Sequence, residues 1–382
     1  MTVRVNKSAF NIREKLSELE RPIGVKGNEL MRAETAQEAG SLLGVGRRNL
    51  CVNGNFKIWQ RGTSIAGGAS GNTSNSYKYV TADHWQTYFY NTYARQDSVL
   101  PSGERVYSFR ETFYTGRLFF AHIIEDGGRI FNQGDYITIS FWAKTSGPST
   151  GVSLGFYWYD GPNWVGGTYT YANIRNNVII EGSEWKYYTA TTQIPANANN
   201  RQHLAIEFDN YSPYGPLFGG SWTQLSGTDW WEFANIQIEK GKVATEFEHR
   251  SYGEELALCQ RYYEKSFPDD VAPARGTSTT SLLNGGQPTS TLDWYATFSA
   301  GTLATHHYFR VPKRGTPQMT LFGTSDNKCI FFDFGTKSLI YPGLVIDSPT
   351  KIGFRSYNNG SGLTNNSSWG LDVFNWTAEA EL

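Results

Sequence analysis

The stretch Ile137-Thr138-Ile139-Ser140-Phe141-Trp142-Ala143 decides the fold class of this chain. Its odd-numbered residues are all apolar, so they share one face of an extended strand. The alternation returns between residues 49 and 250, where clusters of Gly, Pro, Asn and Ser separate the segments 152–156, 185–189, 204–208 and 233–239. Many short strands with one polar face predict a mainly β protein, with an antiparallel jelly-roll β-sandwich over residues 49–250.

The composition of the 382-residue chain supports this fold class and excludes several others. Aromatic residues make up 15% of the chain and charged residues only 18%, which suits strands and aromatic-rich surfaces rather than disorder. The 34 Lys and Arg residues against 35 Asp and Glu give a net charge of −1, so we expect no nucleic-acid partner. No apolar stretch approaches the roughly 18–20 residues of a membrane span, so we expect no membrane insertion.

Residues 1–48 form an N-terminal segment that differs from the rest, because it contains no Trp or Tyr and carries the pattern of short helices. One helix is predicted around residues 12–19, and a second runs from a capping box at 35–38 to Gly44. Helices this short are marginal in isolation, so we expect trimerisation or anchoring to another protein; an unstructured leader is the alternative. The residues predicted to make these contacts are Ile12, Leu16, Leu19, Leu42 and Leu43.

A short connecting helix is predicted for residues 251–268, since Leu256, Cys259 and Tyr263 recur at i, i+3 and i+7. Two interpretations are open: these side chains line a three-helix neck between subunits, or the helix packs on its own sandwich. Residues 269–382 are predicted to form a smaller, distal β-sandwich after a long loop. Its clearest strand segments are 318–322, 328–334, 351–357 and 369–376.

Several ordered motifs between residues 49 and 265 resemble those of a jelly-roll domain in bacteriophage tail proteins. The opening motif is Asn53-Gly54-Asn55-Phe56-Lys57-Ile58-Trp59-Gln60-Arg61-Gly62-Thr63-Ser64, followed by Ala82-Asp83-His84-Trp85. The central strand is 139–144, and the closing motifs are 235–241, 244–250 and 254–263. The chain is similar to tail fibres or receptor-binding tail proteins, often of marine and cyanobacterial phages, whose sandwich resembles carbohydrate-binding modules.

This resemblance implies a tail fibre of the virion, a homotrimer attached by its N-terminus to a tail adaptor or nozzle protein. Residues 35–44 are similar to the short helices before a trimeric fibre body, whereas residues 266–382 resemble the variable distal part only loosely. The resemblance also implies attachment to a host-surface glycan without catalysis. A capsid fibre or structural decoration protein of the virion is one alternative, and a polysaccharide depolymerase is another.

Candidate glycan contacts follow from the way proteins bind sugars, which combines aromatic planes with a few polar groups. The turn-rich segment 158–164 offers this mixture, and a polar distal loop before residue 369 adds one more aromatic side chain. Packing or a trimer interface is the competing interpretation, because large aromatic residues also fill interfaces. The residues predicted to contact a receptor glycan are Trp158, Tyr159, Asp160, Trp164 and Trp369.

No cofactor, metal site or catalytic group is predicted. Modules of the kind that this sandwich resembles often hold a structural calcium near the first strand, where Asn53, Asn55 and Glu239 could supply oxygen ligands, but no dense Asp-x-Asp loop accompanies them. The segment 147–151 fits G-x-S-x-G only formally, because it leads into a strand pattern, so no enzyme is expected. The three widely separated cysteines are predicted to be buried free thiols: Cys51, Cys259 and Cys329.

Overall fold

The computed structural model divides the chain into two compact units, Met1–Arg48 and Asn49–Leu382. The residues that the structure describes are 48–66, 79–87, 91–113, 118–147, 150–159, 169–194, 203–209, 228–269, 271–273, 293–296, 304–322, 330–333, 338–340, 344–358, 369–373 and 375–381. The predicted N-terminal helices, with Ile12, Leu16, Leu19, Leu42 and Leu43, lie outside the described residues. Apart from Arg48, all the described residues belong to the second unit.

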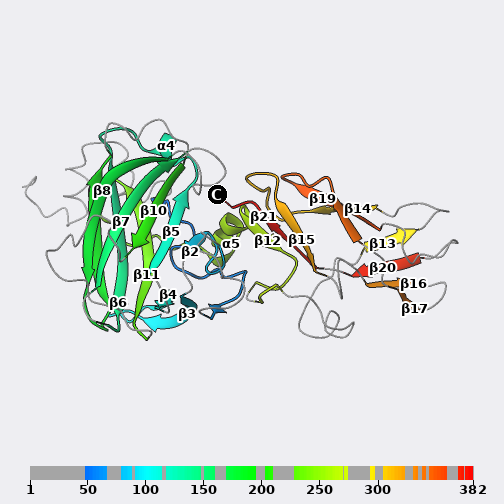
Figure 1. Cartoon of the computed structure of the whole chain (residues 1–382), viewed down its shortest axis with the longest axis horizontal. Helices are drawn as coiled ribbons and strands as arrows, with labels where there is room; N and C mark the ends of the chain where they lie inside the picture. Colours follow the sequence, from blue (N-terminus) through cyan, green and yellow to red (C-terminus); the bar gives the residue numbers. More distant parts are fainter. Residues whose placement is uncertain are drawn as a thin grey trace, which may run out of the picture. The chain divides into compact units, whose positions relative to one another are not determined.

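Two antiparallel sheets form the jelly-roll sandwich (Figure 1). The six-stranded sheet has the order β1 (Ser64–Ile65), β3 (Thr92–Val99), β4 (Arg105–Thr112), β11 (Trp230–Lys240), β6 (Tyr136–Thr145) and β9 (Lys186–Gln193). The five-stranded sheet has the order β2 (Trp85–Thr87), β5 (Phe119–Ile124), β10 (His203–Asp209), β7 (Thr150–Tyr159) and β8 (Tyr169–Ile180). The predicted mainly β, antiparallel fold is confirmed.

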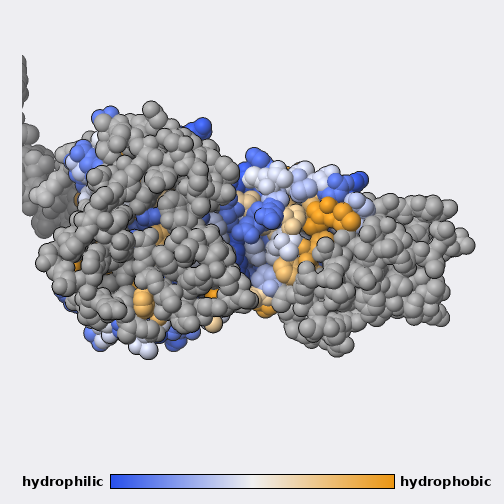
Figure 2. Space-filling view, in the orientation of Figure 1, coloured by the Kyte–Doolittle hydropathy of each residue, from blue (hydrophilic) through white to orange (hydrophobic). Residues whose placement is uncertain are grey.

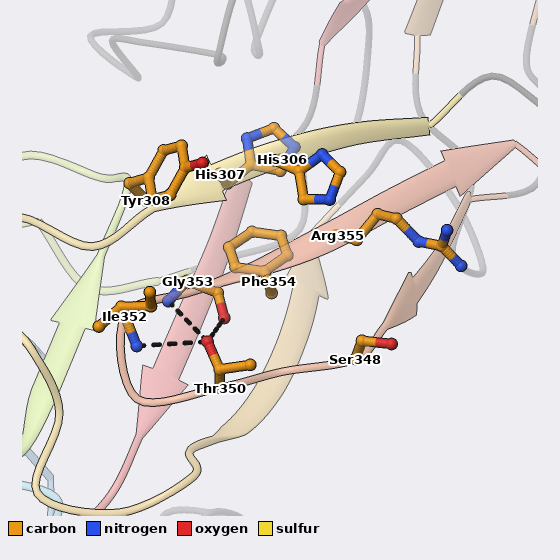
Figure 3. Close-up of a pocket in the computed structure, with 9 residues that line it drawn as sticks. All are labelled: His306, His307, Tyr308, Ser348, Thr350, Ile352, Gly353, Phe354 and Arg355. Atoms are coloured by element: carbon orange, nitrogen blue, oxygen red, sulfur yellow. Dashed lines mark hydrogen bonds between the residues drawn. The ribbon is translucent and has the colours of Figure 1, made fainter.

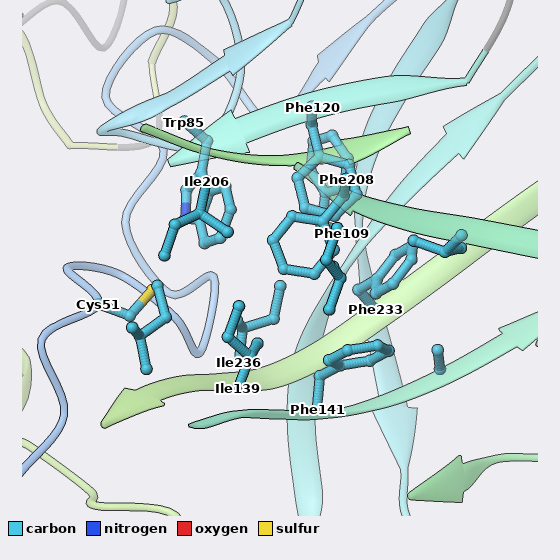
Figure 4. Close-up of a cluster of buried hydrophobic side chains, with 14 of the residues drawn as sticks. Cys51, Trp85, Phe109, Phe120, Ile139, Phe141, Ile206, Phe208, Phe233 and Ile236 are labelled. Carbon is cyan, nitrogen blue, oxygen red and sulfur yellow. The ribbon is translucent and has the colours of Figure 1, made fainter. Parts of the chain in front are cut away.

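The core lies between these two sheets, and the alternation in β6 explains why. Ile139 and Phe141 are fully buried on the inner face of the six-stranded sheet. Across the sandwich, Phe120 and Phe208 of the five-stranded sheet stack with ring centroids 4.6 Å apart (Figure 4). Burial of each such side chain contributes about 1.5–3 kcal/mol, so the apolar face of each strand fixes its orientation in the sheet.

The opening motif of the sequence folds into a buried polar turn at one end of the sandwich. Asn53, at a left-handed φ of 56°, donates its side-chain amide to the carbonyls of Ile58 and Asp83, at 2.8 and 3.0 Å. Its Oδ1 accepts the backbone N–H of Ile58 at 3.0 Å. Gly54 is required beside it, because a Cβ there would lie 2.1 Å from the carbonyl oxygen of Ile236. The motif is therefore a scaffold that closes the first turn.

The connecting helix α5 covers Tyr252–Gln260 and is capped by Ser251, whose hydroxyl accepts the N–H of Glu254. It packs on its own sandwich, since Glu255 is buried and accepts hydrogen bonds from the backbone of Asn53 and from Arg250. The helix is shorter than the predicted 251–268, because the chain turns after Arg261 and joins a sheet. A short helix α4 (Gly127–Ile130) follows β5.

This arrangement corrects the prediction for the connecting segment. Cys259 is 1% exposed and Tyr263 is 4% exposed within a single chain, so neither is available to line a neck between subunits. Tyr263 is not helical at all but begins strand β12 (Tyr263–Lys265). Of the three predicted neck residues only Leu256 is partly exposed, and the interpretation in which the helix packs on its own sandwich fits the structure.

The distal domain contains three small antiparallel sheets. The first has the order β12, β21 (Asn375–Glu379) and β15 (Gln318–Phe322), and the second has the order β14 (Ala304–Tyr308), β19 (Gly353–Asn358) and β18 (Leu344–Asp347). The third has the order β13 (Asp293–Ala296), β20 (Trp369–Val373), β16 (Ile330–Asp333) and β17 (Ser338–Ile340). Phe309, Phe354 and Trp376 form a core between the first two of these sheets. The predicted single strand 369–376 is two strands in different sheets. Figure 2 shows hydrophobic surface residues gathered on this domain.

Candidate functional site

The outer face of the six-stranded sheet carries aromatic and cationic side chains side by side. We call this surface the aromatic face. Its members come from four neighbouring strands and the turn before β9. They are Arg110, Trp142, Lys144, Trp185, Tyr187 and Trp230.

Strand alternation places these residues outside. Phe141 and Ala143 of β6 point into the core, so Trp142 between them points outward. In β11 the inward Trp231 leaves Trp230 on the outer side. Trp142 lies opposite Tyr187 of β9 in the strand register, with ring centroids 5.4 Å apart.

Two cations bind the faces of the tryptophans. The Arg110 guanidinium lies 4.2 Å from the ring centroid of Trp230. The Lys144 ammonium lies 4.5 Å from the ring centroid of Trp185 and 5.8 Å from that of Trp230. Each such cation–π contact contributes about 0.5–1 kcal/mol at an exposed site, so the rings are held in fixed orientations.

A buried carboxylate fixes the cations from below. Glu232 is fully buried on the outer side of β11 and accepts Nε and Nη2 of Arg110 at 2.9 and 2.6 Å. It also accepts the hydroxyls of Ser98 and Ser108 at 2.8 and 2.6 Å, and the Lys144 ammonium lies 3.8 Å away. The bidentate geometry fixes Arg110 both in position and in plane. The aromatic face is thus preorganised and carries one more positive than negative charge.

This geometry suits a ligand that has flat apolar faces and polar edges. Tyr187 is 45% exposed, and Trp142, Trp185 and Trp230 are partly exposed. Aromatic rings at the surface of a rigid sheet can stack against a sugar ring, while Lys144 and the indole N–H groups can bond its hydroxyls.

The predicted receptor residues are only partly placed. Trp158 and Tyr159 are the last residues of β7, where they pair with Leu204 and His203 of β10. Trp369 is the first residue of β20. Asp160 and Trp164, like the side chains of the other three, lie outside the described residues. These contacts stay predictions.

Sequence reasoning missed the aromatic face, although the signal was present. Trp142 lies inside the strand that decided the fold class, at a position between two core residues. A large aromatic side chain at the outward position of an alternating strand marks a candidate binding surface. Its partners on β4, β9 and β11 could not be assigned, because the alternation pattern of a strand does not determine which strands lie beside it in the sheet.

The oxygen atoms proposed for calcium are engaged by protein donors. Both carboxylate oxygens of Glu239 accept hydrogen bonds from Thr245, at 2.5 and 3.0 Å. The side-chain oxygen of Asn53 accepts Ile58, and that of Asn55 accepts the backbone of Lys57. Within the described residues, no group of three or more His, Cys, Asp or Glu side chains is arranged to hold a metal ion.

Two buried acids have raised pKa values. Burial raises the pKa of Asp83 to about 6, against the lowering effect of the Arg61 charge. Burial also raises the pKa of Glu111 to about 8, although Asn91, Phe119 and Trp231 donate hydrogen bonds to it. Both side chains are fully buried, so they link parts of the scaffold and do not face a polymer in solution.

The cysteines and the membrane prediction can be compared with the structure in part. Cys51 and Cys259 are free and buried, and burial raises the pKa of each thiol. Cys329 lies outside the described residues. Among the helices of the described part, none is long and apolar enough to cross a membrane.

Comparison with known proteins identifies similar structures but no family. No protein-family model and no curated protein matches the sequence. Among solved structures, the enzymatically active domain of tailspike protein 4 of bacteriophage CBA120 is 15% identical with a TM-score of 0.30, covering 50% of this chain and 21% of that one. A CBM4 carbohydrate-binding module gives 14% identity and a TM-score of 0.27, with 49% of this chain and 97% of that one covered.

A CBM22 xylan-binding domain of Paenibacillus barcinonensis gives 16% identity and a TM-score of 0.29, covering 46% of this chain and 97% of that one. Likeness at these scores assigns neither family nor activity.

Proposed function

We propose that this chain is a non-catalytic glycan-binding protein that attaches a bacteriophage to its host, as a homotrimeric fibre of the virion tail. The observation that carries glycan binding is the aromatic face, a preorganised set of partly exposed rings with fixed cations between them. The phage role is supported by the motifs between residues 49 and 265 that resemble tail proteins.

Binding without catalysis is supported by the state of the carboxylates. Glycoside hydrolysis needs two carboxyl groups that flank the scissile bond. On the aromatic face the carboxylate is that of Glu232, which is fully buried and saturated by Arg110 and two serine hydroxyls. Three copies of a weak site on one fibre would bind tightly through high effective concentration.

The test of glycan binding removes two neighbouring rings of the aromatic face together. Trp142→Ala with Tyr187→Ala should lower phage adsorption by about tenfold or more, because paired aromatic platforms dominate such contacts. The matched control is Tyr252→Ala, a ring on α5 whose exposure (47%) is similar to that of Tyr187 and which is not part of the aromatic face, so this variant should adsorb normally. If the double variant forms intact fibres and adsorbs like the parent, the aromatic face is not the receptor contact.

The tail role and the trimer have separate tests. Mass photometry of the full chain should give three times 42.9 kDa, and Leu16→Glu with Leu43→Glu should reduce incorporation into tails if residues 1–48 anchor the fibre.

Antibody labelling of virions should mark the tail; labelled heads would indicate a capsid fibre or decoration protein. New reducing ends after incubation with host polysaccharide would indicate a depolymerase.

A further inference from the structure

The distal domain holds a pocket that the aromatic face does not include. Its volume is about 370 Å³, and it lies on the sheet formed by β14, β19 and β18 (Figure 3). The lining comes from the end of β14, the turn at 348–352 and the start of β19. A cavity of this size lies at the lower end of the range for small-molecule pockets, about 300–1,000 Å³.

The pocket exists because one position opposite an aromatic ring has no side chain. Tyr308 pairs directly with Gly353 in the strand register, on the same face of the sheet. A Cβ on Gly353 would lie 2.2 Å from the carbonyl oxygen of His307, so only glycine fits between the two backbones. The ring of Tyr308 therefore has no cross-strand neighbour and is 74% exposed.

The base of the pocket is rigid. The Thr350 hydroxyl donates to the carbonyl of Gly353 at 2.9 Å and accepts the N–H groups of Ile352 and Gly353, which fixes the turn. On the opposite face of the sheet from Tyr308, buried His307 forms a hydrogen bond with the hydroxyl of Ser356 at 2.8 Å. Its ring stacks on that of Phe354, with ring centroids 4.7 Å apart. Burial lowers the pKa of His307 to about 4, so this ring adds no charge at neutral pH.

Polar groups on one row of the sheet complement the aromatic ring. His306, Arg355 and Asp347 lie opposite one another across the three strands. Arg355 forms an ion pair with Asp347, which also accepts the hydroxyl of Ser348 at 2.9 Å. Both charged side chains stay open to solvent, at 41% and 36% exposure. The pair supplies donors and acceptors together while its charges cancel.

We infer that this pocket binds a neutral hexopyranose unit of a glycan, with the sugar ring against Tyr308 and its hydroxyls toward Ser348 and Arg355, which line the pocket, and toward Asp347 beside it. A hexopyranose needs a flat apolar contact and a mixture of donors and acceptors, and the pocket has both. An acidic sugar would find the guanidinium already neutralised by Asp347. The site is independent of the aromatic face and would give the fibre a second point of contact.

The test uses saturation-transfer NMR on the full chain with the methyl α- and β-glycosides of glucose, galactose and mannose, and with methyl glucuronoside as the acidic comparison. At least one neutral glycoside should receive saturation, and Tyr308→Ala should lower its affinity by about fivefold or more, as for the loss of a stacking platform. Tyr308→Phe keeps the ring and should retain binding. Arg355→Ala should also weaken binding. Near-UV circular dichroism checks that each variant is folded.

The outcomes separate this pocket from the aromatic face. Loss of saturation in Tyr308→Ala but not in Trp142→Ala supports the pocket. Transfer that is lost only in Trp142→Ala, transfer only to methyl glucuronoside, or no transfer to any neutral glycoside overturns the inference. The first of these results would leave the proposed function standing, because the aromatic face would then be the sugar site.

Discussion

Arg61 joins the jelly roll to the C-terminal end of the chain, and its replacement makes a sharp prediction. The guanidinium lies 3.0 Å from Glu381, 3.5 Å from Glu379 and 3.7 Å from Asp83, and 3.7 Å from the ring centroid of Tyr263. The side chain of Arg61 is 9% exposed, and those of Asp83 and Glu381 are 1% and 5% exposed. Arg61→Met keeps most of the apolar stem but leaves two buried carboxylates without their cation.

The expected cost follows from that burial. Removing one partner of a buried ion pair costs about 3–5 kcal/mol, because the remaining charge is neither solvated nor paired. Loss of the stacking on Tyr263 adds about 0.5–2 kcal/mol. We therefore expect Arg61→Met to lower the free energy of unfolding by about 3.5–7 kcal/mol at pH 8, where both carboxylates are charged. Arg61→Lys keeps the charge and should lose only about 1–2 kcal/mol.

The pH dependence gives a second readout. In the parent, burial raises the pKa of Asp83 to about 6, so its contribution to stability is present at low pH and is lost as the pH rises through 6. Burial also acts to raise the pKa of Glu381, but His84 and Arg61 lower it overall, so its contribution is lost as the pH falls. Without Arg61 both pKa values rise. The destabilisation should therefore shrink to about 1–2 kcal/mol near pH 4.5, where both groups take up protons.

Urea unfolding at both pH values and hydrogen exchange measure these effects. The N–H of Ala380, which donates to the carbonyl of Tyr262 at 2.7 Å, should exchange more than about a hundredfold faster in Arg61→Met at pH 8. Lys186→Met is the control, since the Lys186–Glu181 pair is 49% and 57% exposed and its loss should not be measurable. Equal destabilisation at pH 8 and pH 4.5 would refute the electrostatic explanation.

Three further perturbations test the scaffold. Lys313→Met should lower the free energy of unfolding, measured with urea, by about 3–5 kcal/mol, because Lys313 and Glu264 form a fully buried ion pair at 2.6 Å. Adding Glu264→Gln should recover part of this loss, and no recovery would contradict the pairing. Gly54→Ala should cost about 1–3 kcal/mol through its clash with a backbone carbonyl, whereas Gly253→Ala, with open space around it, should not destabilise. Because burial raises the pKa of Glu111 from 4.5 to about 8, its contribution to stability is present below the unfolded pKa and is lost as the pH rises toward 8. The melting temperature of Glu111→Gln should therefore depend less on pH across this interval, and an unchanged profile would exclude Glu111 as the titrating group.

Much of the fold could be predicted because period-two alternation reports burial directly. The stretch around Phe141 belongs to β6, and the segments 204–208 and 233–239 lie in β10 and β11. Buried apolar side chains on one face impose this pattern, whatever the strand order. The helix prediction extended too far at 261–268, because the local pattern was helical while pairing of β12 with β21, more than 100 residues away, decided the conformation.

The chain's own order of residues determined its strands, turns and apolar faces, since these depend on neighbours within a few positions. Only the tertiary structure decided which side chains meet. Trp142 and Tyr187 form one surface because β6 and β9 pair, and the pocket beside Tyr308 is hollow because the pairing of β14 with β19 places a glycine opposite the ring. Contacts of this kind join residues that are tens to hundreds of positions apart, and no local period records them.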